Sequence, residues 1–187
     1  MPVTAELIVH PATPDPAVRG LEAQVTWQPH PALLSLLFRL DAQMAVLHVP
    51  APRPVRRADG LWQHTCFEAF IRARDAQAYH EFNCSTSGEW AAYRFASRRA
   101  GMQPAQRMAP PRIGVLRGND MLDVNIDLNL AQLDDFASAI RLELGLAAVI
   151  EHTDGQRSYW ALRHGAAQPD FHDPVTFILR LEGRGTA

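Results

Sequence analysis

Tryptophans near predicted turns are the side chains of this chain best suited to holding a ligand. Trp62, Trp90 and Trp160 each stand close to a junction between a predicted turn and a predicted strand, whereas Trp27 lies on the apolar face of an alternating segment. An indole at such a junction can stack on the apolar face of a sugar, while Arg, Glu, Asn and His side chains bond its hydroxyls. Burial is the competing interpretation for any single ring, because large aromatic side chains are mostly buried.

Cysteine and histidine pairs suggest a second chemistry, a metal site. His64 and Cys66 point the same way from one predicted strand, and His80 and Cys84 share a face of the next. A hairpin register near-symmetric about residue 75 would bring the pairs together as zinc ligands, or would permit a Cys66–Cys84 disulfide. The spacing is not a common zinc pattern, so we favour two reduced, buried thiols and predict no bound metal.

Two carboxylates on neighbouring predicted strands suggest a third chemistry. Glu68 and Glu81 could be the acid and base of a glycosidase. Outward-facing residues of half-buried strands, or a buried Glu paired with Arg, are the interpretation that we favour over catalysis. No nucleotide-binding, phosphate-binding, nucleophile-elbow or zinc-protease motif is present. We therefore predict that the chain is not an enzyme, and we retain Glu68 as a ligand-binding candidate.

Arginine is unevenly distributed. All 18 basic residues are arginine, which removes lysine-dependent Schiff-base and general-base chemistry. Residues 94–117 contain six arginines and no acidic residue, and residues 53–57 contain three more. If these loops meet at one end of the fold, that end would favour an anionic ligand such as a phosphorylated sugar, although solvated loop charge is the simpler explanation.

Short apolar runs, separated by Pro, Gly and Asp, must position all of these side chains. Alternation of polar and apolar residues predicts half-buried strands, among them residues 21–28, 65–72, 79–84, 89–96 and 121–128. Residues 44–49 are expected to pair with residues 33–40, residues 130–136 to form one short helix, and Asp154-Gly155 to turn a hairpin. The pattern predicts an all-β, immunoglobulin-like or jelly-roll β-sandwich of about ten strands with one short helix, in a single domain spanning residues 1–187.

Composition excludes several function classes. The formal charge is −2 and 47% of the residues are hydrophobic, which favours a globular protein that does not bind nucleic acid. No apolar run has the length of a membrane span, so no membrane partner is expected. No secretory signal is visible at the N-terminus, so we expect a cytoplasmic protein.

Three motifs carry a resemblance to a known family. The segment Gly60–Ile71, which contains Trp62 and Glu68, is followed by Tyr79-His80-Glu81-Phe82-Asn83 and by Ser87-Gly88-Glu89-Trp90. Together they resemble the DOMON-like superfamily, which includes the family 9 carbohydrate-binding modules. The resemblance implies a β-sandwich with a ligand site at its loops or on one sheet, where two tryptophans sandwich a terminal sugar. Trp62 and Glu68 match the first tryptophan and the glutamate, and Trp160 is the natural second tryptophan.

The resemblance also bears on cofactors. The sugar-binding modules usually hold calcium through acidic loop residues that have no evident counterpart here. Other DOMON domains bind haem through Met and His; methionines are available, but none stands in a matching motif. We therefore expect no cofactor, with haem as the second choice.

The resulting hypothesis is a non-catalytic module that binds a small molecule, a sugar or sugar derivative, between Trp62 and Trp160. Glu68, Asn83, Trp90 and Arg157 would supply polar or stacking contacts. The alternatives are a haem-binding redox domain and a module that pairs an edge strand with a protein partner. The sequence does not determine the oligomeric state.

Overall fold

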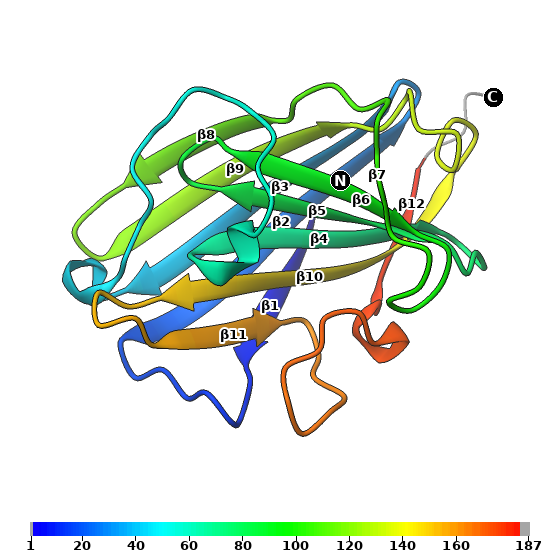
Figure 1. The fold of residues 1–187 in the computed structure, drawn as a ribbon. Coiled ribbons are helices and arrows are strands. Elements are labelled where there is room, and N and C mark those ends of the chain that lie inside the picture. Colours follow the sequence, from blue (N-terminus) through cyan, green and yellow to red (C-terminus); the bar gives the residue numbers. More distant parts are fainter. Residues whose placement is uncertain (1, 184–187) are drawn as a thin grey trace.

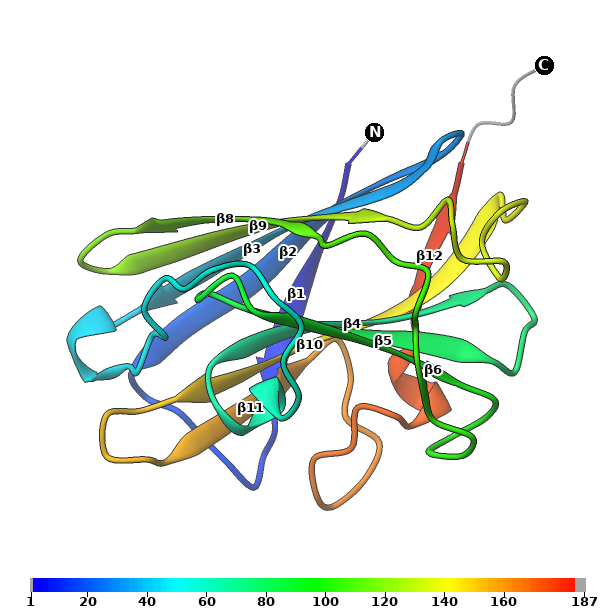
Figure 2. The same cartoon turned by 45° about the horizontal axis from the view of Figure 1, so that its top comes forward.

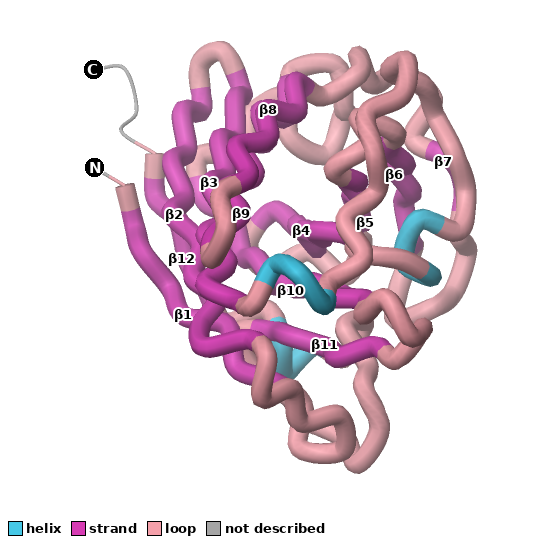
Figure 3. The backbone as a smooth tube through the Cα atoms, turned by 90° about the vertical axis from the view of Figure 1, so that its left-hand side faces the viewer, coloured by secondary structure: helices cyan, strands magenta, loops and turns pink. Residues whose placement is uncertain are grey.

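Strands dominate the computed structural model, which describes residues 2–183 (Figure 1). In chain order they are β1 (Val3–Val9), β2 (Val18–Pro29), β3 (Ala32–Ala42), β4 (Cys66–Ala73), β5 (Tyr79–Ser85), β6 (Trp90–Phe95), β7 (Gln103–Pro104), β8 (Arg112–Arg117), β9 (Met121–Asn129), β10 (Arg141–Glu151), β11 (Arg157–Ala161) and β12 (Leu179–Glu182). The helices are single 3-10 turns: η1 (Met44–Val46), η2 (Leu61–Gln63) and η3 (Pro174–Thr176). An all-β fold is thus confirmed (Figure 3).

The strands form two layers joined by β1 (Figure 2). Sheet A has the order β1-β2-β3-β9-β8, and sheet B has the order β7-β6-β5-β4-β10-β11, with β12 also paired to β10. The first part of β1 pairs with β2, while its end, Ile8 and Val9, pairs with β11 of sheet B. All of these pairings are antiparallel, so the whole is one curled sheet folded over itself.

The hydrophobic core lies between the layers. Sheet A contributes the alternate residues of its strands, including Phe38 from β3 and Val124 from β9, and sheet B contributes Phe67 from β4 and Leu146 from β10. The rings of Phe38 and Phe67 meet across the layers, with centroids 5.1 Å apart. Strand periodicity explains this division, because residues two apart share a face.

Sheet B also has a covered outer face. Every residue from Cys66 to Ile71 in β4 is buried, as is all of β5, so these strands are not half-buried as the alternation predicted. The C-terminal segment covers part of this face, where Phe177 packs with Phe70 and Tyr79 in a second apolar cluster. Polar residues of β4 and β5 therefore lie beneath other parts of the chain rather than in open solvent.

Several local predictions can be compared with the structure. The β4-β5-β6 meander and the hairpin at Asp154-Gly155 are confirmed. Residues 44–49 do not form a strand: β3 pairs with β2 and β9, and residues 44–46 form η1. Residues 130–136 form successive turns rather than a helix, with amides bonded to carbonyls three residues back. None of the helical segments in residues 2–183 has the length and apolar character needed to cross a membrane.

Candidate functional site

A groove of about 1260 Å³ lies on the outer face of sheet B, the face turned away from sheet A. Its floor is formed by side chains of β4, β5, β6, β10 and β11. Its walls come from residues 59–63, which include η2, from residues 99–104 and from residues 168–172. Pockets for drug-sized ligands measure roughly 300–1,000 Å³, so the groove has room for one or more sugar residues.

Aromatic side chains give the groove an apolar surface. It is lined by Trp62, Tyr93, Tyr159 and Phe171. Trp62 lies on η2 and is 49% exposed. The turn begins at Gly60, whose φ of 73° is in the left-handed region that glycine adopts without strain. The preceding residue, Asp59, accepts a hydrogen bond from the Tyr93 hydroxyl, which anchors the Trp62-bearing turn to β6.

Buried polar atoms that lack partners lie at the floor of the groove and beside it. Glu68 is 3% exposed, and its Oε1 makes no hydrogen bond within the described residues. Asn83, its direct partner in the β4–β5 register, donates from Nδ2 to Oε1 of Glu81 at 2.7 Å, and its own Oδ1 is also unpartnered. A buried polar atom left unpaired costs about 1–3 kcal/mol. A ligand that donates hydrogen bonds at this point would remove that cost.

Glu68 and Glu81 influence each other's ionisation. Burial raises the pKa of Glu68 well above its usual range, and the charge of Glu81 raises it further. Burial also raises the pKa of Glu81, although the hydrogen bond from Asn83 and the charge of Arg99 oppose the effect. The pair therefore holds a proton to higher pH than exposed carboxylates do, and it can both donate and accept hydrogen bonds.

A hydrogen-bonded chain of side chains lies beside Glu81. The Tyr79 hydroxyl accepts the backbone N–H of Arg99 at 3.2 Å and lies 2.8 Å from Nδ1 of His172. The other ring nitrogen of His172 is 3.5 Å from Oε2 of Glu81. Burial, with the nearby charge of Arg99, lowers the pKa of His172 to about 4, so the ring is neutral at pH 7. Both of its nitrogens already face protein groups.

The structure does not bring the two predicted indoles together. Trp160 is only 5% exposed and belongs to the core between the sheets, where its Nε1 donates to Ser158 Oγ at 2.9 Å. Its neighbour Tyr159 points the other way and lines the groove. The expectation that Trp62 and Trp160 face one another is therefore wrong, because Trp160 occupies the inward-facing position of β11.

The other candidate residues are divided between core and groove. Trp90 is 3% exposed in the core, with the Arg57 guanidinium 4.2 Å above its ring, so it does not reach the groove as predicted. Glu68 lines the floor, and Asn83 lies buried beside it on the same face. Arg157 is exposed at the start of β11 and donates to the Gln63 carbonyl next to Trp62. It lies near the groove without lining it.

The Cys and His pairs do not converge on a metal. The β4–β5 hairpin pairs Cys66 with Ser85 and Phe67 with Cys84, so the two cysteines lie on opposite faces of sheet B. Both are free thiols, and His80 is buried on the inner side. The register is symmetric about a point between residues 75 and 76, and this small difference from residue 75 changes which side chains share a face.

Most of the arginines expected to attract an anion are already paired. Arg94 binds Asp135, Arg98 and Arg99 both bind Asp170, and Arg56 binds Glu89. The acidic partners come from distant parts of the sequence, which the local count could not reveal. Arg99 is the arginine of this set that lines the groove.

Several groove residues were not singled out from the sequence. Tyr93, Tyr159 and His172 all line it, yet the sequence patterns predicted a binding role for none of them. One sequence feature could have pointed to Tyr159 as a binding residue, namely its position next to a tryptophan in a short predicted strand. Which of the two aromatic side chains faces outward depends on register with β10, where Val149 pairs with Tyr159.

Known structures share this fold, although no protein-family model matches the chain and no curated protein matches its sequence. A protein from Bacteroides uniformis, for which carbohydrate binding is suggested, is 13% identical with a TM-score of 0.67, over 97% of this chain and 86% of that one. A family 9 carbohydrate-binding module from Caldicellulosiruptor kristjanssonii is 10% identical in complexes with glucose and with cellotriose. Their TM-scores are 0.54 and 0.57, over 98% of this chain and 86% and 84% of theirs. The chain therefore has a fold like that of family 9 modules.

Proposed function

We propose that this chain is a non-catalytic module that binds a carbohydrate in the groove on the outer face of sheet B. The observation that carries the proposal is the half-exposed indole of Trp62 beside a floor where Glu68 has a buried oxygen without a partner. A sugar offers both an apolar face for stacking and hydroxyl donors for buried acceptors. Modules of the same fold that bind glucose and cellotriose support this choice of ligand class.

Tyr93, Tyr159 and Phe171 take the role first given to Trp160. They line the same groove as Trp62 from other elements and supply the remaining apolar surface. Arg98 and Arg99 pair with Asp170, and Arg98 also lies 3.3 Å from Asp173, so this wall carries little uncompensated positive charge. We therefore expect a neutral sugar rather than a phosphorylated or acidic one. The proposed function is that of a sugar-binding member of the DOMON-like superfamily, which the motifs of this chain resemble.

Haem, the alternative cofactor, fits the groove residues poorly. Met102 and His172 both line the groove, and Met and His are haem ligands in related domains. Ligation by His172 would break the contact of one ring nitrogen with Tyr79 or of the other with Glu81. The absence of a Soret band after haem titration would exclude haem binding and leave sugar binding as the first choice.

Titration of the protein with a panel of neutral mono- and oligosaccharides, followed by calorimetry, tests the proposal. Trp62→Ala should weaken binding at least about tenfold, which corresponds to about 1.4 kcal/mol. Trp62→Phe is the matched control, because it keeps an aromatic face on η2 and should retain part of the affinity. Each bound sugar should be recovered chemically unchanged.

Two results would contradict this function. One is a panel in which no sugar binds, and the other is binding that Trp62→Ala leaves unaltered. The appearance of shorter saccharides during incubation would instead make Glu68 and Glu81 catalytic, which the proposal excludes.

A further inference from the structure

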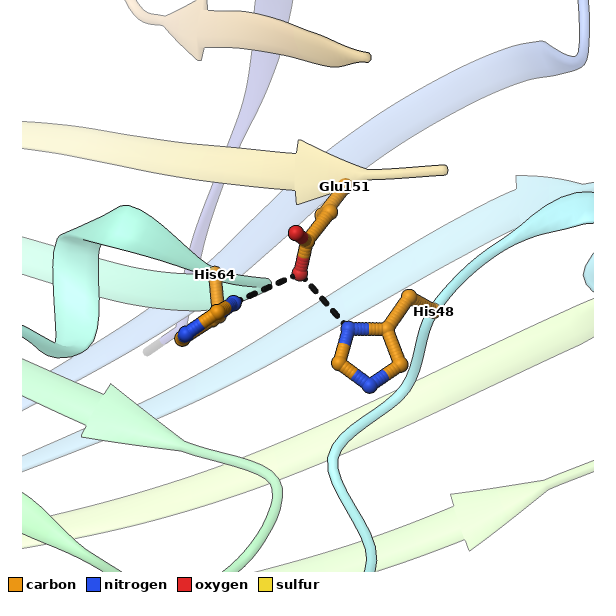
Figure 4. A group of neighbouring side chains, drawn as sticks. All are labelled: His48, His64 and Glu151. Carbon is orange, nitrogen blue, oxygen red and sulfur yellow. Dashed lines mark hydrogen bonds and ion pairs between the residues drawn. The ribbon is translucent and has the colours of Figure 1, made fainter. Parts of the chain in front are cut away.

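Two histidines and a glutamate from three separate segments converge outside the groove (Figure 4). His48 follows η1, His64 follows η2, and Glu151 is the last residue of β10. Oε2 of Glu151 lies 2.6 Å from Nδ1 of His48 and 2.8 Å from Nδ1 of His64. The atoms that could bind a metal all lie within 4.8 Å of one another.

A buried hydroxyl holds these three segments in place. Thr65 is 1% exposed, and its Oγ1 donates to the His48 carbonyl at 2.6 Å and accepts the Glu151 N–H at 3.0 Å. The His48 N–H also donates to the Glu151 carbonyl at 2.8 Å. The backbone from which each side chain projects is therefore fixed by internal hydrogen bonds.

The charges around Glu151 leave it available to a cation. Within residues 2–183 no arginine lies within 4.0 Å of its carboxylate, although other partly buried carboxylates, such as Glu89 and Asp170, are paired with arginine. The imidazoles of His48 and His64 are about half exposed, with side-chain exposures of 50% and 57%. Exposed ion pairs contribute little to stability, about 0–1 kcal/mol. The two ion pairs of Glu151 would therefore add little to the free energy of unfolding.

We propose that His48, His64 and Glu151 form a zinc(II) site. Two imidazole nitrogens and one carboxylate oxygen are a known zinc donor set, and calcium and magnesium prefer all-oxygen ligands. Ligand bonds of about 2.1 Å in a tetrahedral site separate donor atoms by roughly 3.4 Å. The contacts of 2.6 and 2.8 Å between Glu151 and the two imidazoles must therefore lengthen by roughly 0.6–0.8 Å to admit the ion. Water completes the coordination from the solvent side, where the histidines are exposed.

Zinc at this point would join three parts of the chain. His64 is the residue after η2, and its N–H donates to the Leu61 carbonyl within that turn. A bond from the metal to His64 therefore anchors η2 to the end of β10. The site differs from the groove in its residues and goes beyond the proposed sugar binding, so either can fail without the other.

Calorimetric titration of the chelator-treated, untagged full chain with zinc chloride tests the inference. We expect one equivalent of zinc to bind and the melting temperature to rise. Glu151→Gln and His64→Asn keep hydrogen-bonding groups of similar shape while removing a ligand. Because loss of an outer-shell partner alone costs 10–100-fold in metal affinity, each should weaken binding at least about a hundredfold. His30→Asn, at an exposed histidine outside the cluster, should leave affinity unchanged.

The two ligand variants should melt like the wild type in the presence of chelator, which separates loss of metal from loss of fold. The absence of saturable zinc binding to the wild type would overturn the proposal. Binding that falls by less than tenfold in either ligand variant would also overturn it, because the ion would then be held elsewhere.

Discussion

Glu68 and Glu81 lie on adjacent antiparallel strands, on the same face of sheet B, and both reach the floor of one groove. In the register Glu68 pairs with Asn83 and Glu81 pairs with Phe70, so the two carboxylates are diagonal neighbours. Diagonal neighbours on one face are close enough for long side chains to interact. Two carboxyl groups are thus placed near each other in a buried environment, where ionising both is unfavourable.

Replacing Glu68 by Gln should stabilise the protein at neutral pH. The pKa of Glu68 is raised in the folded state, so its favourable contribution is full below about pH 4.5 and is lost as pH rises through the folded-state value. Each unit of pKa difference corresponds to about 1.4 kcal/mol. Urea unfolding should show Glu68→Gln more stable than wild type by at least about 1 kcal/mol at pH 8, with a smaller difference at pH 4. An equal difference at both pH values would show that the charge is not the cause.

The contribution of His172 to stability should change with pH in the direction opposite to that of Glu68. Its pKa is lowered to about 4 by burial and by Arg99. The neutral ring therefore contributes stability above about pH 6.5, which is lost as pH falls towards 4. His172→Asn should lower stability at pH 7 and flatten the acid side of the stability profile, measured by urea unfolding at half-unit steps. Parallel profiles for wild type and variant would rule out His172 as the titrating group.

Trp160 and Trp62 should respond in opposite ways to truncation. Trp160→Ala removes a buried ring from the core and should cost about 3–5 kcal/mol of unfolding free energy. Trp62→Ala removes a half-exposed ring and should cost less than about 1 kcal/mol. Guanidinium unfolding of the two variants measures this contrast. A large loss of stability in Trp62→Ala would mean that this indole is structural and would weaken the case for stacking.

The thiols should be unreactive in the folded protein. Burial raises the pKa of Cys84 to about 12, with a further contribution from Glu68, and burial likewise raises the pKa of Cys66. Because the thiolate is the reactive form, iodoacetamide at pH 8 should modify neither residue in the native state and both in urea, as read by mass spectrometry. Recovery of a Cys66–Cys84 disulfide after mild oxidation of the native protein would contradict the register of the hairpin.

Sequence patterns were most informative where one face of a strand is apolar and the other polar. In β9 the alternation assigned Leu122, Val124, Ile126 and Leu128 to one side, and all four lie in the core. In β10 nearly every residue is buried on both faces, so the sequence has no alternation that shows which residues face the groove. The orientations of Tyr159 and Trp160 depend on pairing with that strand and could not be read locally.

Two other errors have similarly local causes. Leu130, Leu133 and Phe136 have helical spacing, but they are buried by a run of turns that follows β9. Residues 44–49 are as apolar as a strand, yet Met44 and Leu47 enter the core from η1 and its flank. Hydrophobic spacing indicates that residues are buried, and the backbone shape that buries them is selected by tertiary packing.

Strand β1 belongs to both layers, because it lies between β11 of sheet B and β2 of sheet A in the strand order. Five of its residues pair with β2 and its last two with β11, so removing β1 from the sheet breaks pairings in both layers. Amides of β1 that pair with β2 or with β11 should exchange with deuterium more slowly than those of β7 and β8, which lie at the two ends of the strand order and should exchange through local fraying. Coupling between the two layers would then depend on the pairing of Ile8 and Val9 with β11, a contact between segments far apart in the sequence.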